Sequence, residues 1–549
     1  MPRPFRRPWL AATLAAATLA VPATGAGPRF FPDDPIQVDD DRALDASNAV
    51  PLEDTNGYDF LAHSFGHPGE RRDVRALDVN TVDEVPDSSW FTNRIGRAPL
   101  SVADVVRGPD RQHDVDVAGW LVSGGKSSGV QPGFRMTGTD GQVYQIEIDP
   151  PAHPEMASAA EVIGTAFYHA IGYSVVEVHL AEIDRAALRM SDTATIRDPL
   201  NGRRRPMDQH DLDVVFARAA RQSDGRYRVL VSRFAAGRPL GNFRYSGTRP
   251  DDPNDIVPHE HRRSLRAARV FGAWLNHDDS RGVNSLDMLE TGNGHSWIRH
   301  YMFDFGSILG SGTVFAQTPR AGNEYIFEAR PGWLTLVTLG LYVRPWMRID
   351  YPEVPASVGR FESAAFDPRA WRPEYPNPAF DNMRPDDAFW AARIVGRFTD
   401  AMVRGVVEKA RYSDPAATDY VTRTLIARRD KVVRAFLNGV CPVVDPTLGP
   451  DGVLRFANAA VDAGAATPAH AYTLRWFTLD NATGIRTAEG AEVRVTELQA
   501  PAPEGLLARG DFVGVRITGL HPQHPRWASP ASFTFRRNRT GWQLVGVER

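Results

Sequence analysis

The chain has 549 residues, which is too long for one ordinary domain and predicts about two to four domains. Hydrophobic residues make up 42% and charged residues 24%, a balance that excludes a mainly disordered chain. The formal net charge of -4 provides no general basic field, so we expect no nucleic-acid partner. The single cysteine, Cys441, excludes an internal disulfide framework and a cysteine-based zinc site.

The first residues have the pattern of an export signal. Arg3, Arg6 and Arg7 precede an apolar run over residues 9–21, and small residues follow up to Ala26. This order predicts a secretory signal peptide over residues 1–26. The run is shorter than the roughly 20 apolar residues of a membrane span, although an uncleaved anchor is the alternative. We therefore expect an exported protein, periplasmic or extracellular, with no stable membrane span.

The next part of the chain changes from irregular to strand-rich. Residues 27–116 are rich in Asp, Pro and Asn with little periodicity, which predicts an ordered wrapping segment. Residues 117–241 alternate apolar and polar positions in several short runs, which predicts a strand-rich lobe with one helix. The strands are expected over residues 117–124, 133–137, 142–148, 174–183 and 227–234, and the helix over residues 155–170.

The remainder divides into a helical part and a β-rich part. Residues 242–445 carry helical periodicity, with helices expected over 258–276, 386–411 and 415–437. Residues 446–549 alternate like strands and predict a β-sandwich-like domain. The strands expected there cover residues 472–479, 492–497, 512–517, 532–536 and 542–547. The predicted fold class is therefore α+β: a strand-rich N-lobe, a helical C-lobe and a C-terminal all-β sandwich-like domain.

The residues that could perform chemistry follow the helix expected to end at Asn276. A loop there carries Asp279 and, five residues later, Asn284; a hydrophobic strand then leads to Asp304. This arrangement offers two oxygen ligands for a hard cation and one free carboxylate to orient a hydroxyl. The alternative interpretation is that these polar residues cap helix ends and form a turn.

These motifs resemble the catalytic half of the protein kinase-like superfamily. His277, Asp279 and Asn284 keep the His-x-Asp-x-x-x-x-Asn spacing of its catalytic loop, and residues 304–306 match its Asp-Phe-Gly metal motif. The resemblance implies that Asp279 accepts or orients the substrate hydroxyl, while Asn284 and Asp304 hold Mg²⁺. Asp278 is a rival for the catalytic role.

The resemblance also implies a nucleotide lobe upstream. A glycine-rich turn contains Gly124, Gly125, Lys126 and Gly129, and its backbone N–H groups are expected to cover the nucleotide phosphates. The third strand of such a lobe should carry a lysine, but here Glu147 or a neighbour occupies that position. This departure favours either an inactive protein or a lysine supplied from elsewhere.

Lys126 is the candidate for the relocated lysine. The chain has 63 Lys and Arg residues, of which only three are lysines: Lys126, Lys409 and Lys431. A surviving lysine suits a site that needs a compact ammonium, such as a phosphate contact. Glu161 on the following helix is its expected carboxylate partner, with Glu155 as second choice. Glu147 is instead interpreted as a solvent-facing strand residue.

The sequence thus favours an exported, atypical kinase-like protein, similar to secreted or spore-coat kinases. It is expected to bind Mg²⁺ with ATP or another nucleotide and to transfer a phosphoryl or related group to a hydroxyl of an unknown acceptor, either protein or glycan. One alternative is a catalytically inactive kinase-fold binding protein, a pseudokinase. The other is a carbohydrate-active hydrolase with an accessory β-domain.

Overall fold

The computed structural model describes residues 27–52, 56–111, 115–126, 129–198 and 201–549. The predicted signal peptide, residues 1–26, lies outside the described residues, as do Ser127 and Ser128 of the glycine-rich turn. The fold is mixed α+β, with 27% helix and 25% strand distributed over several sheets, as the sequence predicted. Among the described residues, no helix is both long and apolar enough to cross a bilayer.

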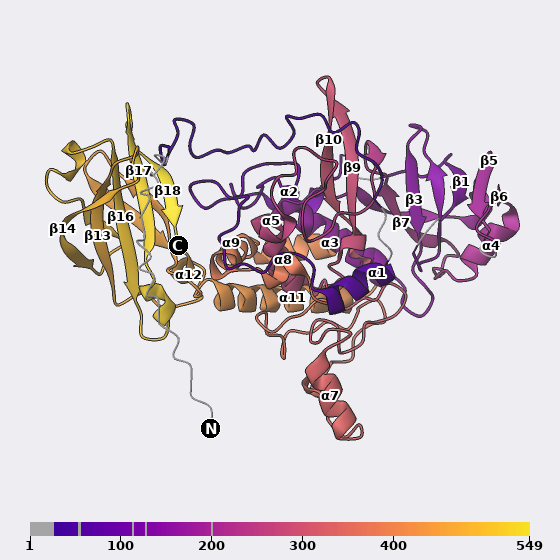
Figure 1. Ribbon diagram of the computed structural model, residues 1–549. Coiled ribbons are helices and arrows are strands. Elements are labelled where there is room, and N and C mark those ends of the chain that lie inside the picture. Colours follow the sequence, from indigo (N-terminus) through magenta and orange to yellow (C-terminus); the bar gives the residue numbers. More distant parts are fainter. Residues whose placement is uncertain (1–26, 53–55, 112–114, 127–128, 199–200) are drawn as a thin grey trace, which may run out of the picture.

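A seven-stranded sheet forms the end of the molecule that lies at the right of Figure 1. Its strand order is β4-β7-β3-β2-β1-β5-β6, and all neighbours are antiparallel except β1 and β5. The strands are β1 (Leu121–Gly125), β2 (Gly133–Thr137), β3 (Val143–Glu147), β4 (Val178–Ile183), β5 (Arg189–Arg197), β6 (Arg204–Pro206) and β7 (Tyr227–Arg233). The expected strands in this part are confirmed within a few residues, whereas β5 and β6 were not predicted.

Side-chain alternation explains how this sheet forms its core. In β3, Tyr144 and Ile146 are buried while the residues between them are partly exposed. The unpredicted helix α4 (Gln209–Phe216) covers the buried face with Leu212 and Phe216, and it begins at a capping box formed by Asp208 and Asp211. A short 3₁₀ turn (Arg185–Ala187) joins β4 to β5.

Helix α3 (Met156–Ile171) connects β3 to β4 and is almost entirely buried. It starts where Asp149 accepts hydrogen bonds from the backbone N–H groups of Ala157 and Ser158, each at 3.0 Å. It ends at Gly172, which has a φ of 147°. The ring of Phe91 packs so close to Gly172 that a Cβ there would clash with it. The helix predicted over residues 155–170 is therefore confirmed.

The helix predicted over residues 258–276 is broken into a 3₁₀ turn (His259–His261), α5 (Arg263–Arg266) and α6 (Ala268–Leu275). Arg262 is extended because Asp78, from the N-terminal segment, accepts hydrogen bonds from Ser264 N–H at 3.1 Å and from Arg263 N–H. The helical region continues with α8 (Pro378–Asp381), α9 (Pro385–Gly396), α10 (Asp400–Lys409) and α11 (Pro415–Phe436), which bear out the two later helix predictions apart from a break between α9 and α10. Helix α11 packs against α6, α9 and α10.

A three-stranded sheet lies between the first sheet and the helices, in the order β10-β9-β8. It consists of β8 (Arg238–Pro239), β9 (Ser285–Gly292) and β10 (His295–Met302). The β9–β10 hairpin joins the loop that ends at Asn284 to Asp304, so it brings the two predicted motifs back to the same end of one hairpin.

The C-terminal part contains two sheets with a common core. One has the order β11-β12-β15 and the other β14-β13-β16-β17-β18. The elements are β11 (Val443–Leu448), β12 (Val453–Asn458), α12 (Ala459–Asp462), β13 (Ala471–Leu479), β14 (Arg486–Val495), β15 (Gln499–Pro501), β16 (Phe512–Leu520), β17 (Ala531–Asn538) and β18 (Gly541–Glu548), with 3₁₀ turns at Leu506–Ala508 and Pro525–Ala528. The expected strands from 472 onward are confirmed, and the core begins at Cys441, slightly before the predicted boundary at 446.

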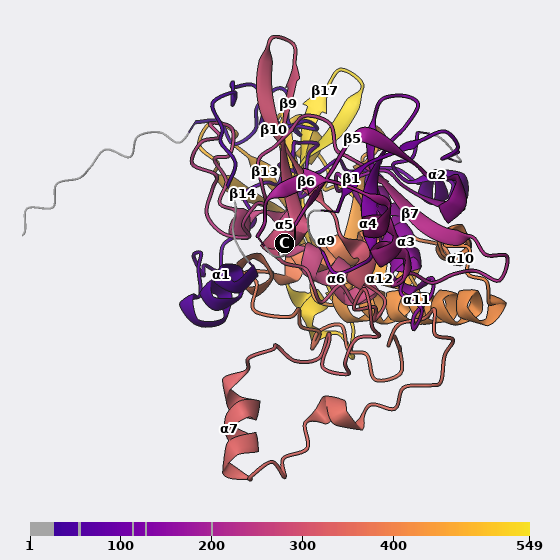
Figure 2. The ribbon, with the colours of Figure 1, turned by 90° about the vertical axis from the view of Figure 1, so that its right-hand side faces the viewer.

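The N-terminal residues run along the whole molecule, from the C-terminal sheets toward α1 (Figures 1 and 2). Phe30 packs with Phe477, Leu479 and Val545 of the C-terminal part. Leu52 then forms a β-bridge with Gly241. The segment contains α1 (Asn56–Leu61), a π-helical turn (Ala62–Gly66) and α2 (Val102–Arg107), and α2 contacts both α3 and α10.

Candidate functional site

The loop between α6 and β9 is held by its own polar groups. Helix α6 ends at Asn276, which adopts the left-handed conformation with φ 53° and turns the chain into the loop. The Ser280 hydroxyl donates to the carbonyl of His277 at 2.6 Å, and the Asn284 amide donates to the carbonyl of Asp279 at 3.0 Å. The amide nitrogen of Asn284 is thus occupied within the loop, which leaves its oxygen as the atom that could bind a cation.

Asp304 has a strained backbone and an accessible side chain. It follows β10 with φ 64° and ψ 56°, a conformation that is unusual for a residue with a Cβ. The next residue, Phe305, is fully buried: its ring stacks on Tyr168 at 4.5 Å and meets the edge of His277 at 5.6 Å. Tyr168 also hydrogen-bonds the Nδ1 atom of His277 at 2.8 Å, so helix α3, the loop and the Asp-Phe-Gly motif pack as one unit.

A glycine in α3 makes this close packing possible. A Cβ at Gly164 would lie 2.5 Å from the Cβ of Phe305, which is closer than non-bonded carbon atoms approach each other. Because Phe305 is inserted against the helix, Asp304 is left exposed beside it. Loss of hydration, and then the charge of Glu147, raise the pKa of Asp304, while Lys126 and Arg281 oppose the rise.

Glu161 does not pair with Lys126 as the sequence predicted. It is 7% exposed, and the backbone N–H groups of Gly306 and Phe305 lie close enough to its carboxylate to oppose a rise in its pKa. Burial raises the pKa of Glu161 well above its ordinary value, and the neighbouring charges of Asp304 and Glu147 raise it further. Its position beside the Asp-Phe-Gly motif ties α3 to residues 304–306.

The partner of Lys126 is Glu147, at 2.5 Å between Nζ and Oε1, and the ammonium also donates to the carbonyl of Gln131 at 3.2 Å. The interpretation of Glu147 as a solvent-facing strand residue was therefore wrong, because its side chain is 22% exposed and paired with Lys126. Strand register gives the reason: Gly125 pairs with Phe134 and Gly133 pairs with Glu147, so the lysine after Gly125 reaches Glu147 across a strand position that has no side chain. The second choice, Glu155, instead accepts a hydrogen bond from the backbone N–H of Ser413 at 2.9 Å.

Two of the predicted phosphate-covering glycines have a packing role. Gly124 and Gly125 are the last residues of β1 rather than part of a turn. A Cβ at Gly124 would lie 2.7 Å from the Arg135 guanidinium, and one at Gly125 would lie 2.4 Å from Ile196. Gly129, with φ 84°, lies in the turn beyond Lys126. Of the predicted glycines, Gly129 alone lies outside β1 and lacks the close contacts that Gly124 and Gly125 make within the sheet.

The structure distinguishes between the two adjacent candidates for the catalytic carboxylate. Asp278 is 2% exposed, and burial followed by the charge of Asp279 raises its pKa well above the ordinary value. Asp279 is partly accessible and pairs with Arg281. The pKa of Asp279 is raised to about 7, chiefly by desolvation. The charge of Arg281 opposes this rise, and the charges of Glu374 and Asp304 add to it. A carboxylate that titrates near neutral pH and reaches solvent suits general-base chemistry.

Arg281 and Glu374 were not recognised in the sequence. Arg281 bridges Asp279 and Glu374, with 2.8 Å to the Glu374 carboxylate. As the one arginine or lysine within the loop from His277 to Asn284, Arg281 could have been found by inspecting that loop. Glu374 lies 93 residues further along the chain, and no local signal points to it.

The site carries an excess of negative charge. In the described part of this cluster, five carboxylates share the space with two cations, Lys126 and Arg281; the carboxylates are those of Glu147, Glu161, Asp279, Asp304 and Glu374. Within the described part of the chain, no group of three or more His, Cys, Asp and Glu residues is arranged to hold a metal ion. A cation here would need oxygen atoms from its ligand as well, which is the usual situation for Mg²⁺ bound with phosphates.

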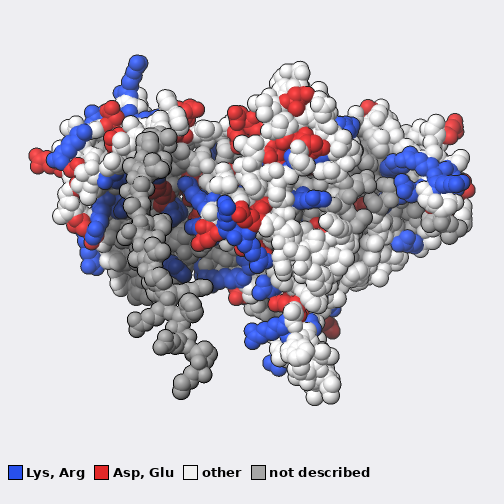
Figure 3. All heavy atoms as spheres, in the orientation of Figure 1, with Lys and Arg blue, Asp and Glu red and all other residues white. Residues whose placement is uncertain are grey.

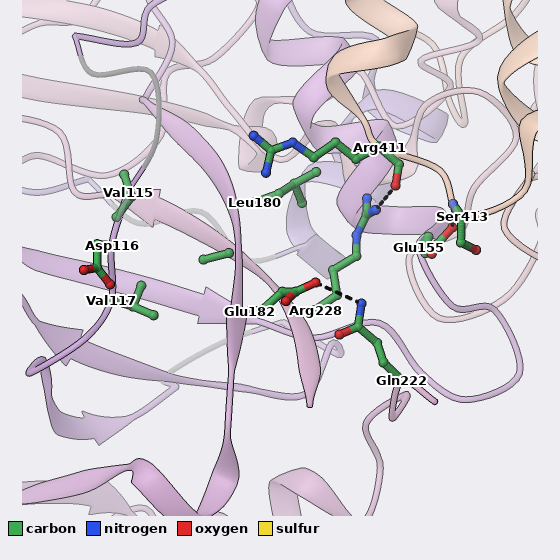
Figure 4. Close-up of a pocket in the computed structure, with 11 residues that line it drawn as sticks. Val115, Asp116, Val117, Glu155, Leu180, Glu182, Gln222, Arg228, Arg411 and Ser413 are labelled. Carbon is green, nitrogen blue, oxygen red and sulfur yellow. Dashed lines mark hydrogen bonds between the residues drawn. The ribbon is translucent and has the colours of Figure 1, made fainter. Parts of the chain in front are cut away.

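One hollow lies beside this cluster and a second lies away from it. One of about 160 Å³ lies between Lys126, Gly129 and residues of α4. Another, of about 360 Å³, lies away from the cluster between the N-terminal sheet and Ser413 (Figure 4). Its central Arg228 donates hydrogen bonds at 2.7 Å to the carbonyls of Ala410 and Arg411, so that guanidinium fastens the sheet to the helical region instead of offering free donors.

Comparison with protein-family models, with curated proteins and with solved structures finds no match to this chain.

Proposed function

We propose that this protein is an exported, atypical kinase-like enzyme that transfers a phosphoryl or related group from a magnesium nucleotide to a hydroxyl. In this proposal residues 117–241 and 242–445 act as the two lobes of a kinase-like core. The observation that carries it is the meeting of Lys126, Glu147 and Glu161 from the N-terminal sheet and α3 with Asp279 and Asp304 from the distant loop and hairpin.

The charges and donors support a cation at Asp304 and Asn284. Asp304 is exposed, strained and surrounded by other carboxylates, so an added cation would relieve repulsion that the two resident cations leave uncompensated. Asn284 contributes a neutral oxygen, and nucleotide phosphates would complete the hard-oxygen shell that Mg²⁺ prefers. Bound there, the ion would neutralise charge on the transferring group.

Asp279 is placed to act on the acceptor. In the proposed reaction the acceptor oxygen bonds to the phosphorus of the donor, the bond to the nucleotide leaving group breaks, and Asp279 takes the hydroxyl proton. Its pKa of about 7 permits both proton states near neutrality, which suits a general base. Arg281 fixes this carboxylate through its second contact, to Glu374.

A second candidate function is an inactive kinase-fold binding protein. The observation in its favour is that the Lys126 ammonium is already neutralised by Glu147 and bound to a carbonyl, so its charge is not free. The two candidates share nucleotide binding and differ in turnover. Among the described residues, no specific contact favours the carbohydrate-active alternative.

The test compares purified full-length protein with the variant Asp304→Ala. Mg²⁺ with each of several nucleoside triphosphates should raise the melting temperature of the unchanged protein, because a ligand that binds the folded state stabilises it. Labelled phosphate should also move to a hydroxyl acceptor. Asp304→Ala should lose both effects.

The chain offers a matched control in Asp445→Ala. Asp445 is another aspartate in the left-handed conformation, with φ 50°, but it lies on β11 and its side chain is 72% exposed. This variant should respond to Mg²⁺-nucleotide like the unchanged protein. A shift in melting temperature without phosphate transfer would favour the inactive binding protein. The absence of any nucleotide-dependent shift would reject both candidates.

A further inference from the structure

A segment far from the candidate site projects away from the body of the protein. It contains α7 (Ala329–Val337) and a 3₁₀ turn (Pro345–Arg348), and Figures 1 and 2 both show α7 standing clear of the neighbouring elements. No residue of α7 is buried. At the tip, Leu339 is 91% exposed and Leu341 is 84% exposed, and Trp333 and Leu336 are each 64% exposed. Apolar side chains exposed to this degree and grouped together indicate an interaction surface.

The charges around this tip follow a definite pattern. Residues 331–343 contain no charged side chain; the nearest charged residues on either side are Arg330 and Arg344, and Glu328, Arg348 and Asp350 lie further out along the chain. Figure 3 shows the projecting end without charge, with both basic and acidic side chains where it joins the body of the protein. Tryptophan and tyrosine side chains, Trp333, Tyr342 and Trp346, also lie in the segment, and such residues are enriched where proteins meet the headgroup region of a bilayer.

The tip is ordered by hydrogen bonds within itself. Gly340 N–H donates to the Thr335 carbonyl at 2.8 Å, the Thr338 hydroxyl donates to the Leu334 carbonyl at 2.7 Å, and Tyr342 N–H donates to the Thr338 hydroxyl at 2.9 Å. Polar backbone groups satisfied in this way can enter an apolar environment at low cost.

The base of the segment is fixed to the body of the protein. Trp346 Nε1 donates to the buried Glu324 carboxylate at 2.7 Å, and Arg344 pairs with the same carboxylate. Arg344 is therefore engaged at the base, whereas Arg330 and Arg348 are exposed beside the tip. These contacts with Glu324 hold the apolar end away from the body of the protein.

We propose that residues 331–343, the membrane-docking tip, insert into the interfacial region of an anionic lipid bilayer, with Arg330 and Arg348 contacting the headgroups. A convex, apolar projection with cationic flanks fits a deformable anionic surface, because lipid can surround it on every side. Its apolar stretch is far shorter than the roughly 20 residues needed to span, so the tip would lie in the interface and not cross the bilayer.

The insertion can be measured at one position. The only cysteine, Cys441, is 2% exposed, so Leu339→Cys can be labelled selectively with the environment-sensitive fluorophore NBD. Vesicles of phosphatidylcholine with phosphatidylglycerol should cause a severalfold rise and a blue shift of NBD emission. The matched control is Ile256→Cys, also apolar and 80% exposed but remote from the tip, whose label should not respond. Both proteins keep residues 1–26, so any vesicle contact of that segment is common to both.

Second variants separate lipid from other partners. Adding Leu341→Asp to the labelled protein should abolish the rise, and Arg330→Glu with Arg348→Glu should remove the preference for phosphatidylglycerol over phosphatidylcholine alone. The melting temperature should not change, because these side chains are exposed. No emission change at Leu339→Cys with vesicles would overturn the proposal. A change without vesicles that grows with protein concentration would also overturn it, since it would indicate that a second copy of the chain covers the tip.

Discussion

Two charged clusters in this protein are built from the same residue types but differ in how their charges balance. Around Arg263, which has no exposed surface, Asp83, Asp386 and Asp387 lie 2.9–3.0 Å from the three guanidinium nitrogens. Arg266 adds a second guanidinium, 3.4 Å from Asp387, and Arg75, Arg384 and Arg549 pair with Asp83 or Asp386, so among the described residues five guanidiniums surround three carboxylates. At the candidate site, by contrast, the carboxylates outnumber Lys126 and Arg281, and Asp304 reaches solvent.

The difference separates a cluster that is paired internally from the candidate binding cluster. Burial lowers the pKa of Arg263, but its three aspartates raise the pKa by more, so Arg263 stays charged in the folded state. At the candidate site, burial and mutual repulsion raise the pKa values of Glu161, Asp279 and Asp304. A cluster that is satisfied internally stabilises the fold, whereas one with uncompensated carboxylates is stabilised by an added cation.

The largest expected effect is on catalysis, from Asp279→Asn. Loss of the proposed general base should reduce phosphate transfer by about 10²- to 10⁴-fold, equivalent to roughly 3–5 kcal/mol in the barrier. The melting-temperature rise with Mg²⁺-nucleotide should remain, because Asp279 is not a proposed cation ligand. Single-turnover transfer rates measure the effect, and an unchanged rate would reject the assigned role.

Breaking the cluster around Arg263 should change the stability of the fold by almost as much free energy as Asp279→Asn adds to the reaction barrier. Arg263→Met removes the one fully buried guanidinium that Asp83, Asp386 and Asp387 share and should lower the free energy of unfolding by about 3–5 kcal/mol. Urea unfolding measures this change. The control is Arg404→Met on α10, whose ion pair with Glu408 at 3.3 Å is exposed and should contribute less than about 1 kcal/mol. Equal losses in both variants would contradict the distinction.

Much of the fold could be predicted because strand alternation and helix periodicity are local signals. The break at Arg262 could not, since it depends on Asp78, which lies 185 residues before Arg263. Strands β5 and β6 were missed because they are polar and largely exposed, so they lack the apolar alternation that predicts a strand.

The motif residues of the site could also be identified from sequence, but their partners could not. The resemblance to kinase motifs picked out Asp279, Asn284 and Asp304, and the scarcity of lysine picked out Lys126. The pairing of Lys126 with Glu147 depends on the register of three strands, and no local sequence pattern specifies that register. Glu374 reaches Arg281 only through tertiary folding.

A smaller effect should follow from replacing the ammonium of Lys126 with a guanidinium. The Lys126 ammonium fits between the Glu147 carboxylate and the Gln131 carbonyl, and the planar fork of Lys126→Arg is larger and directs its donors differently. We expect about 10- to 100-fold slower phosphate transfer, or roughly 1.4–2.8 kcal/mol. Lys431→Arg is the matched control, because Lys431 also binds carbonyls, of Ala364 and Phe366, but far from the site. Transfer that survives Lys126→Arg would show that a compact ammonium is not required there.

The smallest expected effect concerns His169 on α3. This histidine lies among cations, whereas the candidate site is rich in carboxylates. Burial, followed by the charges of Arg94, Lys409 and Arg107, lowers the pKa of His169 from 6.5 to about 3. Between these pH values the unfolded chain binds a proton that the folded protein excludes, so stability falls as the pH decreases from about 6.5. The slope should be roughly 1 kcal/mol per pH unit. His169→Gln should flatten the curve of unfolding free energy against pH by this amount, whereas His210→Gln, at an exposed position of α4, should leave it unchanged. If both variants kept the slope of the unchanged protein, the cations around α3 would not hold His169 neutral.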